Sequence, residues 1–124
     1  MKRPVYFFNP SYDERNINFM NLGLVSIASH LRRKGIPAYV YMNYLDERVT
    51  KEKDYDLVLG DVIKQNPQYI GISCMTTQFG KALGLAQRIR ELDQNVRIVW
   101  GGHHINNESY NDDLYDRYPD LVSE

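Results

Sequence analysis

The sequence of 124 residues lacks the features that mark several common protein classes. No apolar run approaches the ~20 residues that cross a bilayer, and the four apolar residues after Lys2 and Arg3 are too few for a secretory signal. The single cysteine, Cys74, excludes an internal disulfide and favours a reducing compartment. A net charge of −1 lacks the basic surplus of a general nucleic-acid binder. We therefore expect one cytoplasmic domain, residues 1–124, with no membrane span and no nucleic-acid partner.

The charge is distributed unevenly along the chain. From Ile105 onward six acidic residues and one basic residue, Arg117, give this segment a charge of −5, so the remainder carries +4. Such a run is typical of a solvated acidic surface. An acidic docking site is the alternative interpretation.

Short apolar runs alternate with segments of helical spacing. The pattern Leu24, Ile27, Ala28 and Leu31 predicts one buried helix face, and Gly35 is placed to end that helix. The predicted strands cover residues 5–8, 38–41, 69–72 and 96–100, and the predicted helices cover 21–34, 54–65, 79–92 and, more weakly, 109–118. Residues 121–122 are predicted to begin a fifth strand. This alternation predicts an α/β fold with a parallel sheet of four to five strands and helices on both faces.

In open parallel sheets the ligand site lies beyond the carboxyl ends of the strands, which directs attention to the loops 9–21, 73–79 and 101–107. The first loop excludes a dinucleotide-binding fold, because no glycine occurs before Gly23. A phosphate cradle of the Gly-Lys-Ser/Thr type is also absent. Ser73 and Cys74 stand where a phospho-receiver domain places an aspartate.

The second loop offers hydroxyl groups and an amide before the helix at 79–92. Thr76 or Thr77 is suited to cap that helix, and capping by one leaves the others available for a ligand. Cys74 requires a nearby base to act as a nucleophile and is otherwise an inert small hydrophobic residue.

The third loop begins with Gly101 and Gly102, which form either a tight turn or a place where another group approaches the backbone closely. His103 and His104 follow, but adjacent loop histidines seldom chelate one ion together, and no metal-ligand spacing accompanies them. We therefore predict no protein-ligated metal. His30 is interpreted as an ordinary histidine near the end of a helix.

Four segments, in order, resemble a known family. Residues 21–35 resemble its Pro-x-Leu-Gly-Leu…Ala-x-x-Leu-Arg-x-x-Gly segment, 71–78 its Gly-Ile-Ser-x-Met-Thr, 101–104 its Gly-Gly-Pro-His, and 121–124 its Val-Val-x-Gly-Glu. The family is the amino-terminal cobalamin-binding domain of radical S-adenosylmethionine (radical SAM) proteins, which include anaerobic Mg-protoporphyrin ester cyclases and many methyltransferases.

The resemblance implies a flavodoxin-like (Rossmann-like), doubly wound fold that holds cobalamin across the carboxyl edge of a five-stranded parallel sheet. Ser73 and Met75 would line the slot for the nucleotide tail, Gly101 and Gly102 would let the tail lie against backbone, and the first loop would face the corrin. The candidate cofactor-binding residues are Asn9, Pro10, Ser11, Leu22, Gly23, Ser73, Met75, Thr76, Thr77, Gln78, Gly101, Gly102, His103 and His104.

The sequence departs from the family pattern at several positions. The Asp-x-His-x-x-Gly motif of the wider fold, whose histidine ligates cobalt, is absent. Asn21 stands where proline is common, and His103 replaces the proline of Gly-Gly-Pro-His. The Cys-x-x-x-Cys-x-x-Cys motif of the catalytic barrel is also absent. The chain therefore resembles an amino-terminal fragment, or a free-standing relative, that is not catalytic by itself.

The resulting hypothesis is a cobalamin-binding module. It would present the corrinoid to a downstream radical SAM barrel, which carries the [4Fe-4S] cluster and S-adenosylmethionine, for methyl transfer or cyclase-type chemistry. The missing cobalt-ligating histidine motivates an alternative, a cofactor-free interaction or substrate-recognition scaffold. An independent thiol or metal enzyme using Cys74 and His104 is a third hypothesis.

Overall fold

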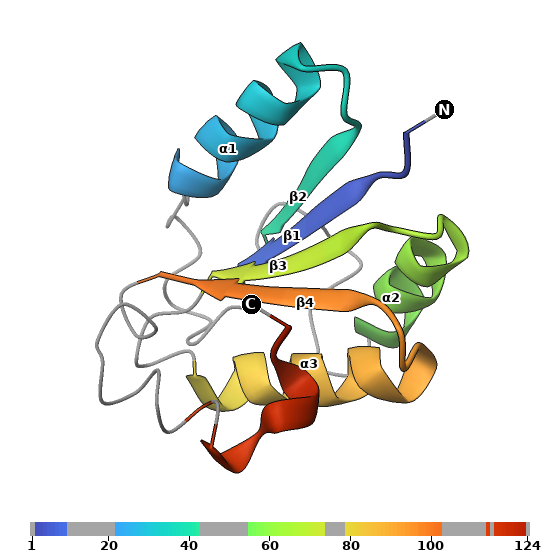
Figure 1. Cartoon of the computed structure of the whole chain (residues 1–124), viewed down its shortest axis with the longest axis vertical. Coiled ribbons are helices and arrows are strands. Elements are labelled where there is room, and N and C mark those ends of the chain that lie inside the picture. The colour runs from blue at the N-terminus through green and yellow to red at the C-terminus, as the bar shows by residue number, and fades with distance from the viewer. Residues whose placement is uncertain are drawn as a thin grey trace.

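The computed structural model of the chain describes residues 2–9, 22–42, 55–73, 79–102, 114 and 116–123. Within these residues four parallel strands form one sheet in the order β2-β1-β3-β4 (Figure 1). The strands are β1 (Val5–Asn9), β2 (Ala38–Met42), β3 (Tyr69–Ser73) and β4 (Arg97–Gly101). Helix α1 (Leu22–Arg33) lies on one side of the sheet, and α2 (Tyr55–Lys64) and α3 (Phe79–Leu92) lie on the other (Figure 1). The predicted doubly wound α/β fold is confirmed.

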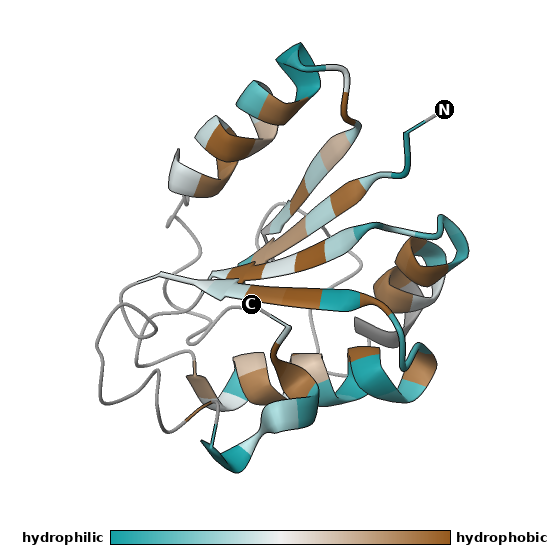
Figure 2. Ribbon diagram, in the orientation of Figure 1, coloured by the Kyte–Doolittle hydropathy of each residue, from teal (hydrophilic) through white to brown (hydrophobic). Residues whose placement is uncertain are grey.

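The main hydrophobic core lies between the sheet and helices α2 and α3, where apolar residues gather on the facing surfaces (Figure 2). The apolar residues predicted from helical spacing contribute to this core. Val58, Leu59 and Val62 of α2 are at most 1% exposed. The strands contribute every second residue, as the pleat requires. The core residues of the strands and of α3 are Tyr6, Phe8, Ile70, Ile72, Ile98, Trp100, Ala82, Leu85, Ala86 and Ile89.

Helix α1 covers only part of the opposite face. Leu24 and Ala28 are buried as predicted, but Ile27 is 49% exposed, so its predicted place on the buried face is wrong. The other buried hydrophobic residues of this face are Val5 in β1 and Ala38 in β2. A helix that lies over the edge half of a sheet buries a narrow stripe, and Ile27 falls on the flank of that stripe.

The predicted helix ends are set by backbone geometry. Gly35 has φ +80°, the left-handed conformation that ends a helix, and its N–H donates to the Arg32 carbonyl at 3.0 Å. Asn66 has φ +54° and ends α2 before Pro67. The first of these endings agrees with the prediction from Gly35.

Aromatic residues of β1 and β2 stack on the core side of the sheet. The Tyr6 ring lies 5.2 Å from Tyr39 and 6.1 Å from Tyr41, and Phe8 lies 5.3 Å from Tyr41. Burial raises the pKa of the Tyr6 phenol, and the neighbouring Tyr41 and Tyr39 raise it further. This phenol therefore stays neutral at physiological pH and acts as part of the core.

The predicted fifth strand at residues 121–122 is wrong. Leu121 instead ends a 3-10 helix, η5 (Pro119–Leu121), because the fixed φ of Pro119 suits a helical turn and the Leu121 carbonyl accepts a hydrogen bond from Trp100 Nε1 at 2.8 Å. Val122 is extended, and the Ser123 N–H donates to the Ile98 carbonyl at 2.8 Å. Ser123 thus bonds to the backbone of β4, while Leu121 and Val122 form no strand beside it.

The helix predicted over 109–118 is described only in part. Leu114, Asp116 and Arg117 are helical, and Tyr118 follows the end of that turn. Asp116 and Asp120 are exposed, which agrees with a solvated acidic surface. No helix in the described ranges is long and apolar enough to cross a membrane.

Candidate functional site

The carboxyl ends of β3 and β4 bring two of the predicted residues together. Ser73 and Gly101 are the last residues of their strands and are paired in register. A Cβ atom built on Gly101 would meet no heavy atom within 4 Å, so open space lies beside this backbone. The site therefore combines a hydroxyl group with a position that has no side chain and no close neighbour.

Gly102 has a different role from Gly101. Its φ of +101° lies in the region that residues with a side chain rarely adopt, so a glycine is needed where the chain leaves β4. The sequence left two interpretations of this glycine pair. The backbone of Gly102 fits a turn, and the open space at Gly101 fits a place where another group can approach the backbone closely.

A strip of the sheet runs from this edge along the face that carries α1. We define the glycine strip as Phe7, Gly71, Ser73, Val99 and Gly101, which occupy two successive rows on one face because side chains alternate along a strand. Ser73 and Gly101 form the row at the carboxyl edge. Phe7, Gly71 and Val99 form the next row, about 7 Å further along the strands.

The glycine strip lies beside the part of the face that α1 covers. Within the strip Gly71 is buried under the Phe7 ring, whereas Phe7, Ser73, Val99 and Gly101 are only partly buried. The other buried residues described on this side come from α1, β1 and β2. Figure 1 shows α1 over the β2 end of the sheet and β4 at the opposite edge. The glycine strip is therefore the more accessible half of this face within the described residues.

Phe7 and Gly71 are in direct contact across the strip. A Cβ atom on Gly71 would lie 2.5 Å from Cδ1 and 2.8 Å from Cε1 of Phe7, so the ring occupies the space that a side chain at residue 71 would need. Phe7 is only partly buried, although its neighbour Phe8 is 1% exposed. The glycine at residue 71 thus lets an aromatic ring lie across β3.

We expect Gly71→Ala to lower the free energy of unfolding by about 1–3 kcal/mol, because the new methyl group must displace the Phe7 ring. In a Phe7→Ala background the same substitution should cost much less, since the colliding ring is gone. Urea denaturation of the four variants of this cycle measures the coupling. An equal cost of Gly71→Ala in both backgrounds would contradict the assigned contact.

The remaining predicted site residues divide into two groups. Asn9 ends β1 and is buried, with 6% of its surface exposed. It lies at the same level of the sheet as Ser73, because the preceding residues Phe8 and Ile72 are paired. Leu22 begins α1, and Gly23 is exposed in its first turn. Outside the described residues lie Pro10, Ser11, Cys74, Met75, Thr76, Thr77, Gln78, His103 and His104.

Sequence reasoning missed Phe7, Gly71 and Val99 as part of this surface. Their signal was present, because Gly71 and Val99 lie two residues before Ser73 and Gly101 and therefore share their face. The strand pairing that brings Phe7 beside Gly71 joins segments more than 60 residues apart, and no local pattern shows it.

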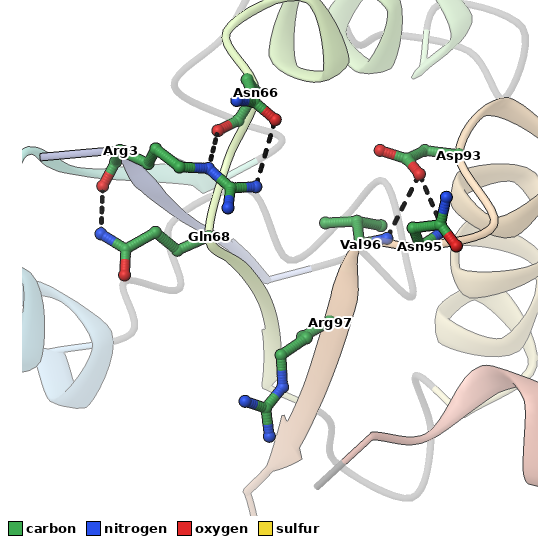
Figure 3. Close-up of a pocket in the computed structure, with 7 residues that line it drawn as sticks. All are labelled: Arg3, Asn66, Gln68, Asp93, Asn95, Val96 and Arg97. Atoms are coloured by element: carbon green, nitrogen blue, oxygen red, sulfur yellow. Dashed lines mark hydrogen bonds between the residues drawn. The ribbon is translucent and has the colours of Figure 1, made fainter.

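The described parts of the chain contain no group of three or more His, Cys, Asp or Glu residues placed to hold a metal ion. A hollow of about 340 Å³ lies at the opposite, amino end of β3 and β4, lined by Arg3, Asn66, Gln68, Asp93, Asn95, Val96 and Arg97 (Figure 3).

The groups that line this hollow bind one another. Arg3 donates from Nε to the Asn66 carbonyl at 2.9 Å and from Nη2 to Asn66 Oδ1 at 3.1 Å. Asp93 Oδ1 accepts the N–H groups of Asn95 and Val96 at 2.8 and 3.2 Å. These bonds hold the turns before β3 and β4, so we assign the hollow a structural role.

Comparison with known families finds the B12 binding domain at residues 15–116, a span that includes α1, β3 and β4. The observed sheet order and the helices on both faces agree with the flavodoxin-like fold of that domain. Among curated proteins, no match is found.

Proposed function

The chain belongs to the B12 binding domain family, and from this premise we propose that cobalamin binds at the carboxyl edge of the sheet with its nucleotide tail against Ser73 and Gly101. The family match supports cobalamin binding. The observation that carries the proposed position is the open space beside Gly101, next to a hydroxyl-bearing residue in register.

The residues at this edge fit the chemistry of the cofactor. The tail of cobalamin is a long, narrow chain with a phosphate, a ribose and a planar base, so it needs a backbone surface without side chains and groups that donate hydrogen bonds. Gly101 leaves such a surface open, and Ser73 provides a hydroxyl group at the same level. When bound, the cobalt of the corrin supplies methyl-transfer chemistry, and this chain holds and orients the group.

The first loop does not supply a cobalt ligand of the usual kind, because residues 10–21 contain no histidine. Binding must therefore come from the tail and the corrin periphery rather than from an imidazole of that loop. This places greater weight on the contacts at Ser73 and Gly101.

The proposal also includes a catalytic partner domain. The four motifs that resemble cobalamin-binding domains of radical SAM proteins support a role in presenting the corrinoid to a radical SAM barrel, for methyl transfer or cyclase-type chemistry in the cytoplasm. One cysteine cannot hold a [4Fe-4S] cluster by a three-cysteine motif, so the cluster and S-adenosylmethionine would belong to that barrel. The encoded sequence after Glu124 tests this part, because the proposal expects a Cys-x-x-x-Cys-x-x-Cys motif there.

Cobalamin binding is tested by titration with hydroxocobalamin. We expect a saturable change in corrin absorbance, co-elution of the corrinoid with the protein on a sizing column, and quenching of the single tryptophan, Trp100, which immediately precedes Gly101. Free hydroxocobalamin and the heat-unfolded chain serve as controls. No spectral change together with no retention would overturn the proposal and favour the cofactor-free scaffold.

A further inference from the structure

Strand β2 lies at one edge of the described sheet and pairs there only with β1. The parallel pattern begins with Val5, whose N–H donates to the Pro37 carbonyl at 2.8 Å. Pro37 and every second residue after it therefore bond to β1. The N–H and C=O groups of Ala38 and Val40 consequently point outward, and such a row of groups can pair with a strand of another chain.

Arg32 occupies the outer side of β2 at its amino end. Its Nε donates to the outward carbonyl of Ala38 at 2.6 Å. Its guanidinium carbon lies 5.5 Å from the centre of the Tyr39 ring, which also stacks on Tyr6 at 5.2 Å. Helix α1 and the Tyr39 ring lie on opposite faces of the sheet, so the Arg32 side chain passes around the edge (Figure 1).

The two contacts of Arg32 are those that a neighbouring strand would make. A paired strand would donate a backbone N–H to the Ala38 carbonyl and would place a side chain against the Tyr39 ring. One guanidinium takes both places. Arg32 is therefore a substitute for a strand at this end of the edge.

The rest of the β2 edge is left open. Within the described part of the chain, no group bonds to the outward N–H or C=O of Val40. Tyr39 is 45% exposed despite its contact with Arg32. Val25 of α1 is 39% exposed and lies seven residues before Arg32, hence on the flank of the helix that faces the edge. The edge thus combines free backbone groups with exposed apolar side chains.

We propose that the β2 edge is a surface on which a second copy of this chain adds its own β2 antiparallel, and that Arg32 limits this pairing. The edge is complementary to itself. A two-fold axis at Val40 sets the N–H of each Val40 opposite the C=O of the other, which gives two hydrogen bonds. The same register sets Tyr39 of each copy opposite Tyr41 of the other on the core side of the sheet. For the edges to meet fully, both copies must release Arg32 from Ala38 and Tyr39.

The test compares Arg32→Ala with Arg33→Ala by sedimentation velocity over a range of protein concentrations. Arg33 is the matched control, because it is the next exposed cation of α1 and makes no hydrogen bond or ring contact with the described residues. We expect Arg32→Ala to lower the dissociation constant of the dimer by about tenfold or more, since a charge-assisted hydrogen bond and a cation–π contact no longer compete with the incoming strand. Arg33→Ala should sediment as the unmodified chain does.

Val40→Pro identifies the edge at which the copies meet. Proline lacks the outward N–H, and the ladder between β2 and β1 does not use that group. Arg32→Ala/Val40→Pro should therefore sediment as the unmodified chain does, whereas Arg32→Ala/Val40→Ala keeps the N–H and should remain a dimer. Far-UV circular dichroism checks that each variant is folded. If the proline variant unfolds, Tyr39→Ser in the Arg32→Ala background replaces it and should weaken the dimer by about threefold or more.

Three results would overturn the proposal. The first is an Arg32→Ala variant that associates no more than Arg33→Ala does. The second is a dimer that persists at full strength in the Val40→Pro or Tyr39→Ser background, because it must use another surface. The third is an unmodified chain that dimerises as strongly as Arg32→Ala, since Arg32 would then limit nothing. None of these measurements requires cobalamin, so their outcome is separate from that of the proposed cofactor site.

Discussion

Gly101→Val is expected to weaken cobalamin binding by about 100-fold or more while the fold stays intact, a loss that corresponds to about 2.8 kcal/mol. The fold should accept valine because a Cβ at this position meets nothing within 4 Å and valine suits a strand. The same side chain would fill the space in which we place the nucleotide tail. Titration with hydroxocobalamin measures the loss, and far-UV circular dichroism checks the fold.

Gly84→Val is the matched control for this substitution. Gly84 lies in α3, away from the proposed site, and a Cβ there also meets nothing within 4 Å. It should bind hydroxocobalamin as the unmodified chain does. Unchanged binding by Gly101→Val would show that the tail does not lie at this residue. Gly102 is a poorer test, because its φ of +101° makes any substitution there strained.

Trp100→Ala is expected to lower the free energy of unfolding by about 3–5 kcal/mol, a large share of the stability of a typical domain. Trp100 is 7% exposed, packs against Phe79 with ring centres 6.3 Å apart, and donates to the Leu121 carbonyl. The substitution removes this packing and leaves a buried carbonyl without its donor.

Urea denaturation followed by far-UV circular dichroism measures this effect, because Trp100 is the only tryptophan and fluorescence is lost with it. Leu92→Ala, at a 38% exposed position, should change stability by less than about 0.5 kcal/mol. The loss of stability caused by Trp100→Phe should lie between those of Trp100→Ala and Leu92→Ala, since phenylalanine keeps an aromatic ring and lacks the hydrogen-bond donor. A cost of Trp100→Ala as small as that of Leu92→Ala would contradict the assigned packing.

The helices on the core side were predicted well from local patterns. The predicted range of α3 agrees with the structure, and that of α2 differs by one residue at each end. The reason is that both helices bury an apolar stripe along their length, so spacing alone identifies them. At the end of α2, Asn66 and Pro67 add a local stop.

The sequence-based predictions fail where the surrounding fold, and not only the local segment, determines the structure. Ile27 has the spacing of a core residue, yet α1 lies over the β1–β2 half of the sheet and leaves it half exposed. Leu121 has strand character, but the donor of Trp100 and the ring of Pro119 hold it in a helical turn. The exposure of Ile27 and the hydrogen bond between Trp100 and Leu121 depend on residues that are distant in the sequence, whereas Pro119 acts locally.

In the candidate site too, some features follow from the local sequence and others only from the tertiary structure. The sequence by itself determined the alternating α/β order, the ends of β3 and β4 to within one residue, and the helix stop at Gly35, because each follows from local spacing or from a backbone conformation that glycine favours. Only the tertiary structure decided that Ser73 lies beside Gly101 and that the Phe7 ring lies over Gly71. Strand register joins residues that are far apart along the chain, so these neighbours become visible only when the sheet is assembled.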